Sequence, residues 1–323
     1  MLMNIALTGA TGFLGRYIAN RLLRAGHNCQ CWFRSQSDRG GFVSGPGRLT
    51  WIPGTLGDDA ATEGLVTGVD AVVHAGVHRP EEGMGHRGAE GDPTAFADTN
   101  VLGSLKLIQA ARHRQVERFV FVSTCGVHDR ILEDRPLDET HPRWPLTHYG
   151  ASKAAVEMFV HSFGLPHRMN PQAAPTHRHL AEKHLWPICA LRPVGIYGLR
   201  RPPSAGKWYR VVQRVLDGEA VEDPSGGKEV HAEDVAGAVE VLLHADADRV
   251  AGQCFNCYDQ YVAAEAVARI AVARTGSDSC ITTQNRGPRH QIRTEKLKAL
   301  GATFGGASRL ETYVQELIDV IRR

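Results

Sequence analysis

A tyrosine and a lysine four positions apart carry the first sign of chemistry in this chain. Tyr149 and Lys153 lie in HYGASKAAVE (148–157), and residues four apart on a helix share one face. A neighbouring ammonium stabilises a phenolate and lowers the pKa of the tyrosine, which then transfers a proton at a substrate hydroxyl or carbonyl. With 7 Tyr in the chain, the pair alone does not separate an active site from one turn of a surface helix.

A glycine-rich turn near the N-terminus indicates where a dinucleotide binds. LTGATGFLG places Gly9, Gly12 and Gly15 between an apolar run and an amphipathic stretch. In that context the first glycine allows a tight turn, the second lets backbone approach a pyrophosphate, and the third lets the helix pack on the strand. The helix N-terminus adds N–H donors and partial positive charge for the phosphates. The turn therefore predicts dinucleotide binding.

Apolar strands and amphipathic helices alternate along the chain. Strands are expected at residues 3–8, 28–34, 48–53, 70–76, 118–124 and 186–193. Helices are expected at residues 13–25, 58–66, 94–115, 148–163, 233–245 and 308–323. This order is typical of an α/β fold with a Rossmann-type doubly wound parallel sheet, whose ligands lie beyond the carboxyl ends of the strands.

The domain organisation follows from where this alternation stops. Residues 1–193 are expected to form the NAD(P)-binding domain, with 229–246 returning to it, and 194–323 to form mainly a smaller substrate-binding region. Two segments are expected to be loops. Residues 77–93 leave the ligand edge of the sheet and are a candidate lid, and 164–186 form a histidine-rich insertion.

The composition argues against several classes of function. The chain has 37 basic and 35 acidic residues and a net charge of +2, which gives no reason to expect nucleic acid or a membrane as the partner. The N-terminus lacks the basic start of a secretion signal, and no apolar run is long enough for a membrane span. The 7 Cys are odd in number and scattered, as expected for reduced thiols in a cytoplasmic protein.

Neither the cysteines nor the histidines form a metal-binding motif. Cys254 and Cys257 make a CxxC without a second ligand pair, so buried strand cysteines are expected there. His177, His179 and His184 lie close in sequence, but positions two apart do not share a helix face. A solvated insertion is therefore expected in place of a metal site.

Taken together, the motifs resemble the extended short-chain dehydrogenase/reductase superfamily, in its NAD(P)-dependent epimerase/dehydratase group. The resemblance rests on TGATGFLG, HYGASK and LRPVGIYG in this order and covers nearly the whole chain. It includes NVLGSLKLIQAA from Asn100, FVFVSTCGVH from Phe119 and HAEDVAGAV from His231. It implies an enzyme with a nicotinamide cofactor and a small-molecule substrate.

The resemblance also implies roles around the Tyr149–Lys153 pair. Lys153 is expected to bind the nicotinamide ribose as well, and Thr124, three residues before Val127, to hydrogen-bond the reacting oxygen. A homodimer is implied, with helices at about 94–115 and 148–163 forming a four-helix interface.

The residue after the second strand indicates which cofactor binds. NAD-specific members end this strand with an acid, but this chain has Phe33 followed by Arg34. A guanidinium suits a ribose phosphate, so NADP(H) is expected, with Arg34 and Ser35 or Arg39 at the phosphate. NAD(H) is the alternative, and Arg34 is then a solvated strand end. The cofactor contacts implied are Gly9, Thr11, Gly12, Phe13, Leu14, Gly15, Arg34, Ser35, Leu56, Ala75, Gly76, Asn100, Ser123, Tyr149, Lys153 and Pro193.

Departures from the family pattern bear on the reaction. Sugar-nucleotide dehydratases of the superfamily carry Thr-Asp-Glu where this chain has Thr124-Cys125-Gly126, which disfavours a dehydratase that uses those acids. Cys125 is either reactive or buried. The usual tyrosine of VYG is His128, which either contacts the substrate or packs in the core.

Two positions that commonly help hold the diphosphate of a nucleotide-linked sugar are glycines here. They are Gly195 and Gly227, with Lys228 next to the latter, and their loss argues against a standard nucleotide-sugar epimerase. Val194 and Gly195 join Cys125 and His128 as candidate substrate contacts. Cations that could substitute for the missing diphosphate contacts are Arg200, Arg201, Lys207 and Arg210.

Three functions fit these observations. The first is an NAD(P)-dependent oxidoreductase that acts on a carbonyl or secondary alcohol, with Tyr149 as acid/base. The second is a sugar or nucleotide-sugar epimerase that keeps its cofactor bound, and the third is a non-catalytic dinucleotide sensor. The sequence leaves the identity of the substrate open.

Overall fold

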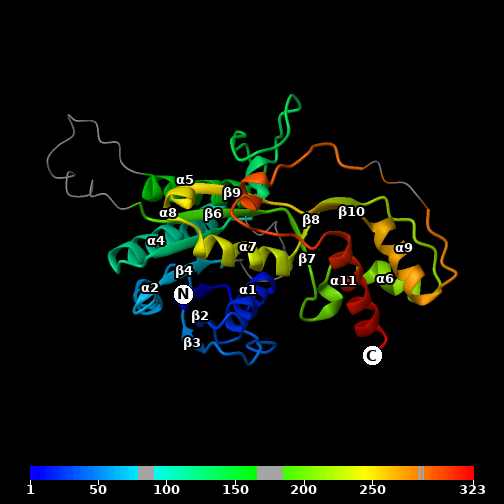
Figure 1. The fold of residues 1–323 in the computed structure, drawn as a ribbon, viewed down its shortest axis with the longest axis horizontal. Helices are drawn as coiled ribbons and strands as arrows, with labels where there is room; N and C mark the ends of the chain where they lie inside the picture. Colours follow the sequence, from blue (N-terminus) through cyan, green and yellow to red (C-terminus); the bar gives the residue numbers. More distant parts are fainter. Residues whose placement is uncertain (79–90, 166–184, 283–284, 286) are drawn as a thin grey trace. The chain divides into compact units, whose positions relative to one another are not determined.

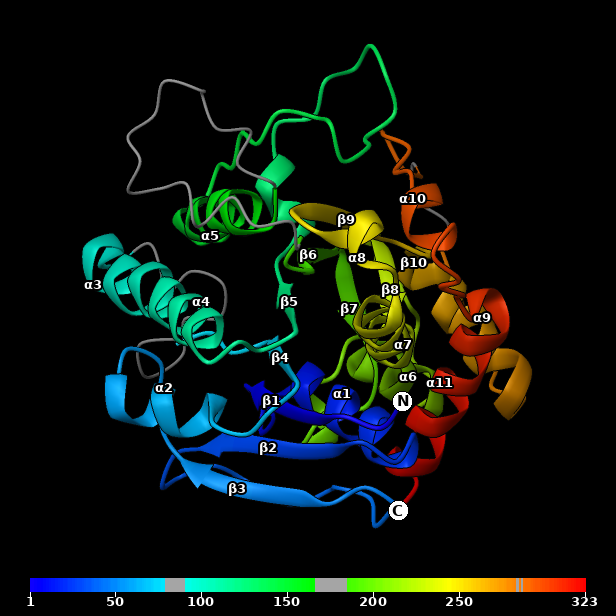
Figure 2. The same ribbon diagram turned by 60° about the vertical axis from the view of Figure 1, so that its left-hand side comes forward.

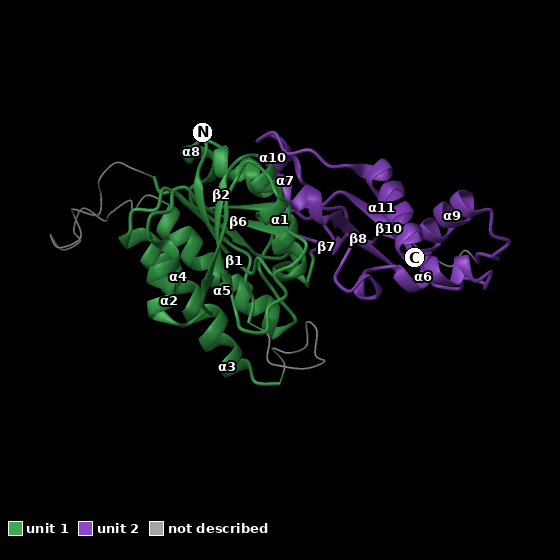
Figure 3. Ribbon diagram, turned by 90° about the horizontal axis from the view of Figure 1, so that it is seen from below, with its two compact units in different colours: residues 1–131, 139–192, 239–255 green, residues 132–138, 193–238, 256–323 purple. Residues whose placement is uncertain are grey.

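The computed structural model describes residues 1–323 apart from 79–90, 166–184, 283–284 and 286 (Figure 1). The chain forms two compact units (Figure 3). Unit 1 comprises residues 1–131, 139–192 and 239–255, and unit 2 comprises residues 132–138, 193–238 and 256–323. The domain boundaries expected from the sequence stay a prediction.

A seven-stranded sheet in the order β3-β2-β1-β4-β5-β6-β9 forms the centre of unit 1. Its strands are β1 (Asn4–Thr8), β2 (Asn28–Phe33), β3 (Leu49–Pro53), β4 (Ala71–His74), β5 (Arg118–Val122), β6 (Ile188–Pro193) and β9 (Gln253–Cys257). Each neighbouring pair from β3 to β6 is parallel. The doubly wound parallel sheet predicted from the sequence is confirmed, and six of its strands lie within a few residues of the expected positions.

Helices connect these strands. They are α1 (Phe13–Arg24), α2 (Asp59–Val66), α3 (Pro93–Ala97), the π-helix η2 (Asp98–Leu102), α4 (Gly103–His113), the 3₁₀ helix η3 (Cys125–His128), α5 (His148–Gly164) and α8 (Ala247–Val250). The single helix expected at 94–115 is thus divided by a π-helical turn. Figure 2 shows α4 and α5 beside β4 and β5.

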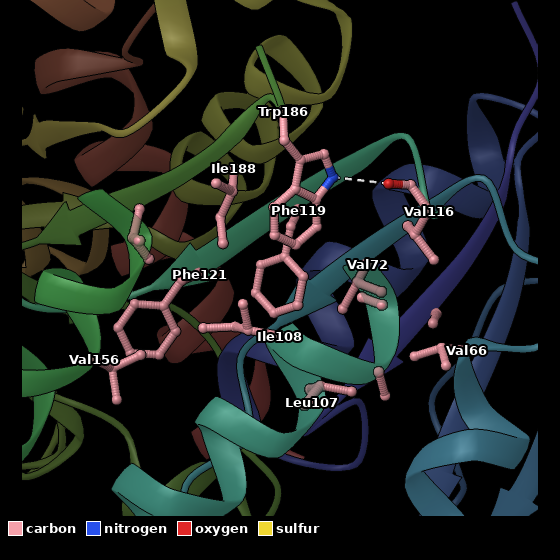
Figure 4. Packing of buried hydrophobic residues seen from close by; sticks show 14 of the residues in the cluster. Val66, Val72, Leu107, Ile108, Val116, Phe119, Phe121, Val156, Trp186 and Ile188 are labelled. Atoms are coloured by element: carbon pink, nitrogen blue, oxygen red, sulfur yellow. Dashed lines mark hydrogen bonds between the residues drawn. The ribbon is translucent and has the colours of Figure 1, made fainter. Parts of the chain in front are cut away.

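One apolar cluster joins the sheet of unit 1 to α2, α4 and α5 (Figure 4). Phe119 and Phe121 on β5 point into it together with Leu107 of α4 and Val156 of α5. All four side chains are at most 1% exposed. The cluster includes Trp186, whose indole N–H donates to the carbonyl oxygen of Val116 at 2.7 Å. Burial of this much apolar surface holds α5 firmly against the carboxyl end of β5.

Unit 2 contains a three-stranded sheet in the order β10-β8-β7. The strands are β7 (Gly195–Tyr197), β8 (Gly226–His231) and β10 (Gln260–Ala263), and β8 runs parallel to β7 and antiparallel to β10. The helices are η5 (Pro203–Ala205), α6 (Tyr209–Leu216), α7 (Ala232–His244), α9 (Ala264–Thr275), α10 (Glu295–Lys298) and α11 (Gly306–Ile321). Buried side chains of α6, α9 and α11 form its apolar core. Helix α7 begins in unit 2 and ends in unit 1.

Candidate functional site

The glycine turn between β1 and α1 has no room for side chains. Gly9 has φ +74°, and a Cβ there would lie 2.7 Å from the backbone nitrogen of Gly76 and 2.8 Å from the carbonyl oxygen of Ala75. A Cβ on Gly15 would lie 2.0 Å from the carbonyl oxygen of Gly9. The turn after β1, the start of α1 and the turn after β4 therefore come together only because these positions lack side chains.

The start of α1 fits the phosphates of a dinucleotide. Gly12 caps the helix in an extended conformation and is exposed, and no side chain hydrogen-bonds to the cap. The first turn contains no acidic residue, so nothing there repels an anion. The backbone N–H groups of Phe13 and Leu14 belong to this first turn, where helix donors have no intrahelical acceptor. Thr11 precedes the cap and is half-buried.

Substitution of Gly15 by alanine is expected to destabilise the protein by about 3 kcal/mol and to weaken cofactor binding, because the new methyl group collides with backbone. Gly64→Ala in α2 is the matched control. Nothing lies within 4 Å of a Cβ at Gly64, so alanine should raise stability by about 0.5–1 kcal/mol. Urea unfolding measures the free energy of unfolding, and calorimetric titration with NADPH measures cofactor binding. If Gly15→Ala and Gly64→Ala had the same stability and the same affinity for NADPH, the tight contact at the turn would be contradicted.

Arg34 and Arg39 follow β2 and have different surroundings. The Arg34 side chain is exposed, and its backbone N–H donates to the Ser37 hydroxyl at 3.0 Å. Among the described residues, no hydrogen bond or ion pair engages the Arg34 guanidinium. The Arg39 guanidinium lies 4.5 Å from the centre of the Phe33 ring, a cation–π contact. Ser35 is exposed beside Arg34, so a charge and a hydroxyl face solvent at the strand end.

Helix α5 begins immediately before the tyrosine of the Tyr149–Lys153 pair. The Thr147 hydroxyl caps the helix by accepting from the Gly150 N–H at 3.0 Å. A Cβ on Gly150 would lie 2.7 Å from the carbonyl oxygen of Gly126, so this glycine lets α5 approach η3. Tyr149 is half-buried at the first turn.

Lys153, one turn after the tyrosine on α5, contacts strand β5. Its side chain is buried, and Nζ donates to the carbonyl oxygen of Val122 at 2.8 Å. The same nitrogen lies 4.5 Å from the centre of the Phe121 ring. Burial of an ammonium is costly unless its charge is compensated, and a carbonyl oxygen and an aromatic face both do this. The ammonium therefore has a defined position on the face of α5 that carries Tyr149.

A pocket in unit 1 brings several predicted site residues together. It is lined by Gly76, Val77, Phe96, Asn100, Ser104, Phe121, Tyr149, Ser152, Lys153 and Val156. Gly76 links it to the glycine turn, because a Cβ on Gly9 would touch its backbone nitrogen. The predicted cofactor contact Leu56 is half-buried and packs against the apolar cluster that joins the sheet of unit 1 to α2, α4 and α5.

Asn100 lies in the π-helix and fixes the chain after β4. Its side-chain oxygen accepts from the His78 N–H at 2.8 Å, and its amide nitrogen donates to the His78 carbonyl oxygen at 3.0 Å. The same nitrogen lies 3.0 Å from the Phe96 carbonyl oxygen. π-Helical turns often occur at functional sites, and this one turns the Asn100 amide onto the backbone beside the pocket.

A buried histidine, which the sequence did not single out, connects two walls of the site. His74 Nδ1 lies 2.7 Å from the Thr8 hydroxyl, and Nε2 lies 2.8 Å from the Ser104 hydroxyl. The Thr8 hydroxyl also accepts from the Gly76 N–H at 3.0 Å. Burial, with a smaller contribution from the charge of Lys153, lowers the pKa of His74 to about 3. The ring is therefore neutral near pH 7 and joins β1, β4 and α4 by hydrogen bonds.

The end of β5 carries Ser123 and Thr124 with different orientations. The Thr124 hydroxyl accepts from the Gly126 N–H at 3.1 Å, and the side chain is half-buried. The Ser123 hydroxyl is buried and donates to Oε1 of Glu157 at 2.6 Å. Cys125 Sγ lies 3.0 Å from the carbonyl oxygen of Arg192. The cofactor and substrate contacts expected of these residues stay predictions.

His128 is enclosed within unit 1. It is 1% exposed, with Nδ1 2.9 Å from the Pro142 carbonyl oxygen and Nε2 2.9 Å from a guanidinium nitrogen of Arg192. Burial and the charge of Arg192 lower the pKa of His128 to about 4. Both ring nitrogens are therefore engaged, and a contact of His128 with substrate stays a prediction.

A fully buried ion pair joins α5 to β6. Arg192 on β6 donates from Nε to Oε1 of Glu157 at 2.9 Å and from a terminal nitrogen to Oε2 at 2.7 Å. The two side chains are 1% and 0% exposed. Arg143 lies 3.6 Å from the same carboxylate and 2.6 Å from a ring nitrogen of His161. Glu157 follows Lys153 by one turn of α5, so this network fixes the helix that carries Tyr149.

The remaining predicted contacts lie in unit 2. Pro193 is buried at the end of β6, and the Val194 N–H donates to the Cys257 carbonyl oxygen at 3.2 Å. Gly195 begins β7 opposite Glu229 of β8.

Several expectations about loops and metals concern residues that the structure does not describe. Most of the candidate lid 77–93 and of the insertion 164–186, including His177, His179 and His184, lies outside the described residues. In the described part of the chain, no group of three or more His, Cys, Asp or Glu side chains is placed to hold a metal ion. No described helix has the length and apolar character needed to cross a membrane.

Known proteins of similar sequence and structure agree with this architecture. The model of the NAD dependent epimerase/dehydratase family matches residues 5–257. The Low-salt glycan biosynthesis protein Agl12 of Haloferax volcanii is 26% identical over 316 residues, which cover 93% of each chain.

Two solved structures share the fold at low sequence identity. The UDP-glucose 4-epimerase of Thermotoga maritima, solved with UDP-glucose, has a TM-score of 0.73 at 20% identity and covers 99% of each chain. RMD from Pseudomonas aeruginosa, complexed with NADPH, has a TM-score of 0.71 at 18% identity and covers 98% of each chain. The family match extends over most of the sequence and includes the glycine turn and the Tyr149–Lys153 pair. The chain belongs to the NAD dependent epimerase/dehydratase family.

Proposed function

We propose that the protein is an NADP(H)-dependent oxidoreductase acting on a carbonyl or secondary alcohol, with Tyr149 as the acid/base. One observation carries the proposal: Tyr149 and Lys153 line a single pocket with Gly76 and Asn100, and Gly76 adjoins the glycine turn. A bound nicotinamide cofactor would accept or donate the hydride. We further propose that unit 1 holds this cofactor and that unit 2 supplies substrate contacts.

The roles of the side chains follow from their contacts. The Tyr149 phenol is the group that gives or takes the proton at the reacting oxygen. The Lys153 ammonium, held by the Val122 carbonyl oxygen, favours the phenolate by its charge. The Thr124 hydroxyl oxygen accepts from the Gly126 N–H, which leaves its own O–H to donate to the substrate oxygen. The exposed N-terminus of α1 would bind the phosphates.

The preference for NADP(H) is proposed from the exposed guanidinium of Arg34 beside Ser35. Arg34→Ala is expected to raise the Kd for NADPH by roughly tenfold to a hundredfold and to leave the Kd for NADH nearly unchanged. The reason is that NADPH carries the ribose phosphate that the guanidinium would bind, and NADH does not. Fluorescence titrations with both cofactors measure this. Arg24→Ala, at the opposite end of α1, is the control for removal of an exposed arginine. Equal losses for both cofactors would contradict phosphate recognition by Arg34.

A sugar or nucleotide-sugar epimerase is the second candidate, supported by the family description and by the fold shared with the UDP-glucose 4-epimerase of Thermotoga maritima. An epimerase returns the hydride to the substrate. This candidate function therefore predicts that oxidised cofactor co-purifies with the protein and that no cofactor is consumed during turnover. Mass spectrometry of the cofactor, followed by a screen of carbonyls and nucleotide sugars with reduced cofactor, separates the two functions. Steady consumption of reduced cofactor would exclude the epimerase.

A non-catalytic dinucleotide sensor is the third candidate. The arrangement of Tyr149, Lys153 and Thr124 counts against it, because a sensor needs no proton donor. Any turnover that depends on the Tyr149 hydroxyl would exclude it.

Homodimer formation is proposed from exposed apolar side chains on the helices expected at the interface. Leu102 in η2 is 46% exposed and Met158 in α5 is 43% exposed. Sedimentation equilibrium measures the association. The cytoplasmic location expected from the scattered cysteines stays a prediction.

A further inference from the structure

Thr8 and His74 end two neighbouring parallel strands of unit 1. They are the last residues of β1 and β4, they are partners in the register of the sheet, and both side chains are buried. The carboxyl ends of the strands are the edge at which a Rossmann-type sheet binds its ligand. A hydroxyl and an imidazole buried at this edge need hydrogen-bond partners, and the structure gives them a connected set.

The hydrogen bonds of Ser104 fix which ring nitrogen of His74 carries a proton. The Ser104 hydroxyl donates to the carbonyl oxygen of Asn100, which can only accept. Toward His74 the Ser104 oxygen must therefore accept, so Nε2, which lies 2.8 Å away, is the protonated nitrogen. Because burial and, to a lesser degree, the charge of Lys153 lower the pKa of His74, the ring carries no second proton near pH 7.

The other ring nitrogen then accepts from Thr8. Nδ1 lies 2.7 Å from the Thr8 hydroxyl, whose oxygen accepts from the Gly76 N–H at 3.0 Å and whose proton is donated to the ring. The result is one hydrogen-bond chain that runs in a single direction, from the Gly76 N–H through Thr8, His74 and Ser104 to the Asn100 carbonyl oxygen. Loss of the hydroxyl at position 8 or 104 would interrupt it.

Both ends of the hydrogen-bond chain hold the segment that follows β4, residues 75–78, called here the wall segment. The Gly76 N–H is the first donor of the chain. Asn100, the last acceptor, also binds the wall segment with its side chain, which contacts the N–H and the carbonyl oxygen of His78 at 2.8 and 3.0 Å. Gly76 and Val77 line the pocket. The backbone that forms this side of the pocket is therefore fixed at two points.

The wall segment also packs against the glycine turn. A Cβ on Gly9 would lie 2.7 Å from the backbone nitrogen of Gly76 and 2.8 Å from the carbonyl oxygen of Ala75. A shift of the wall segment would therefore displace the glycine turn, the lining of the pocket, or both. Because the proposed cofactor occupies both places, its affinity depends on where the wall segment lies.

Resting on the proposed function, we propose that His74 is a positioning residue for the nicotinamide cofactor. As the tautomer protonated on Nε2, it joins Thr8 to Ser104 and thereby holds the wall segment in the conformation that binds the dinucleotide. This role differs from the proton transfer of Tyr149, because His74 acts only through the backbone that it fixes.

Calorimetric titration of the full-length protein with NADPH and with NADH tests the proposal without turnover. Thr8→Val removes the hydroxyl and is expected to raise the Kd of the tighter-binding cofactor roughly tenfold. The matched control is Thr62→Val, which removes an equally buried hydroxyl that donates to the Asp58 carbonyl oxygen in α2. This control should leave the Kd unchanged, and urea unfolding verifies that both variants fold. Equal Kd values for the two variants would overturn the proposal.

A double variant tests whether Thr8 and Ser104 act through one hydrogen-bond chain. Ser104→Ala interrupts the chain on the other side of His74 and is also expected to raise the Kd roughly tenfold. The double variant Thr8→Val/Ser104→Ala should then bind little more weakly than either single variant, because the second substitution breaks a chain that is already broken. A loss of roughly a hundredfold, as for two independent effects, would contradict the chain. If Thr8→Val does not fold, Ser104→Ala compared with Thr62→Val decides.

Nitrogen-15 NMR of the histidine side chains tests the direction of the hydrogen-bond chain. The signals of His74 are those that disappear in His74→Gln, and they are expected to show a neutral ring protonated on Nε2 near pH 7. A ring protonated on Nδ1, or a charged ring, would overturn the proposal.

The titrations also separate this inference from the proposed function. If the wild-type protein binds a cofactor but turns over no substrate, the proposed oxidoreductase fails and the role of His74 stands or falls with the Kd values. If turnover is found and Thr8→Val binds cofactor as tightly as Thr62→Val, only the role of His74 fails. If neither cofactor binds the wild-type protein, both are wrong.

Discussion

Replacement of Tyr149 by phenylalanine is expected to lower kcat/KM of the cofactor-dependent reaction by roughly 10²–10⁴-fold. The phenyl ring fills the same space at the first turn of α5 but has no hydroxyl to exchange a proton with the reacting oxygen. The Thr147 cap of α5 and the hydrogen bond from Lys153 to the Val122 carbonyl oxygen use other atoms, so both should persist in the variant. The loss should therefore appear in kcat, with little change in the Kd for the cofactor.

The control for this variant is Tyr261→Phe in unit 2, which removes a tyrosine hydroxyl bonded to Asn285 at 2.9 Å. It should keep nearly full activity. Stopped-flow measurement of the hydride step with NADPH distinguishes loss of chemistry from loss of binding. A Tyr149→Phe variant with wild-type kcat would show that another group moves the proton.

Elements with strong local patterns were predictable from the sequence, and elements defined by distant contacts were not. Continuous apolar strands and the amphipathic α1 each carry their own signal within a short window. The helix expected at 94–115 is divided at Asp98–Leu102, where the Asn100 amide binds the His78 and Phe96 backbone. The strand expected around Cys254 and Cys257 is β9. Helices α6 and α9 were missed, and both are defined by packing of their buried side chains in the apolar core of unit 2.

The same distinction holds for the site. The glycine turn and the Tyr149–Lys153 pair were predictable because each lies within a few consecutive residues, the turn between β1 and α1 and the pair on α5. The Glu157–Arg192 pair joins residues 35 apart in sequence, on α5 and β6, and no local pattern links them. Two signals were present: Arg192 is a charge within the apolar strand ICALRP, and Glu157 follows Lys153 by four on the same helix. A charge in a buried strand requires a partner, although the sequence does not say which one.

Replacement of Arg192 by methionine is expected to lower the free energy of unfolding by about 3–5 kcal/mol near pH 7, because it leaves the Glu157 carboxylate buried without its partner. Arg143→Met is the matched control. Its guanidinium lies farther from the same carboxylate, at 3.6 Å, and the side chain is 28% exposed, so a loss of about 1 kcal/mol is expected. Urea unfolding of both variants measures the difference, and similar losses would show that Arg192 is not the main counterion.

The pH dependence of this effect distinguishes a lost charge from lost packing. In the wild-type protein burial alone would raise the pKa of Glu157, but Arg192 and Ser123 lower it below its ordinary value. Above the unfolded-state pKa of about 4.3 the ionised carboxylate therefore stabilises the folded protein. This stabilisation is lost as pH falls through the lower pKa of the folded state. Without Arg192, burial should raise the folded pKa above the unfolded one. In the variant the protonated carboxyl group therefore favours folding, fully so below about pH 4.3. This contribution to stability is lost as pH rises through the raised pKa of the folded state. The deficit of Arg192→Met should therefore shrink as pH is lowered from 7 toward about 5, whereas a deficit caused only by lost packing would not change with pH.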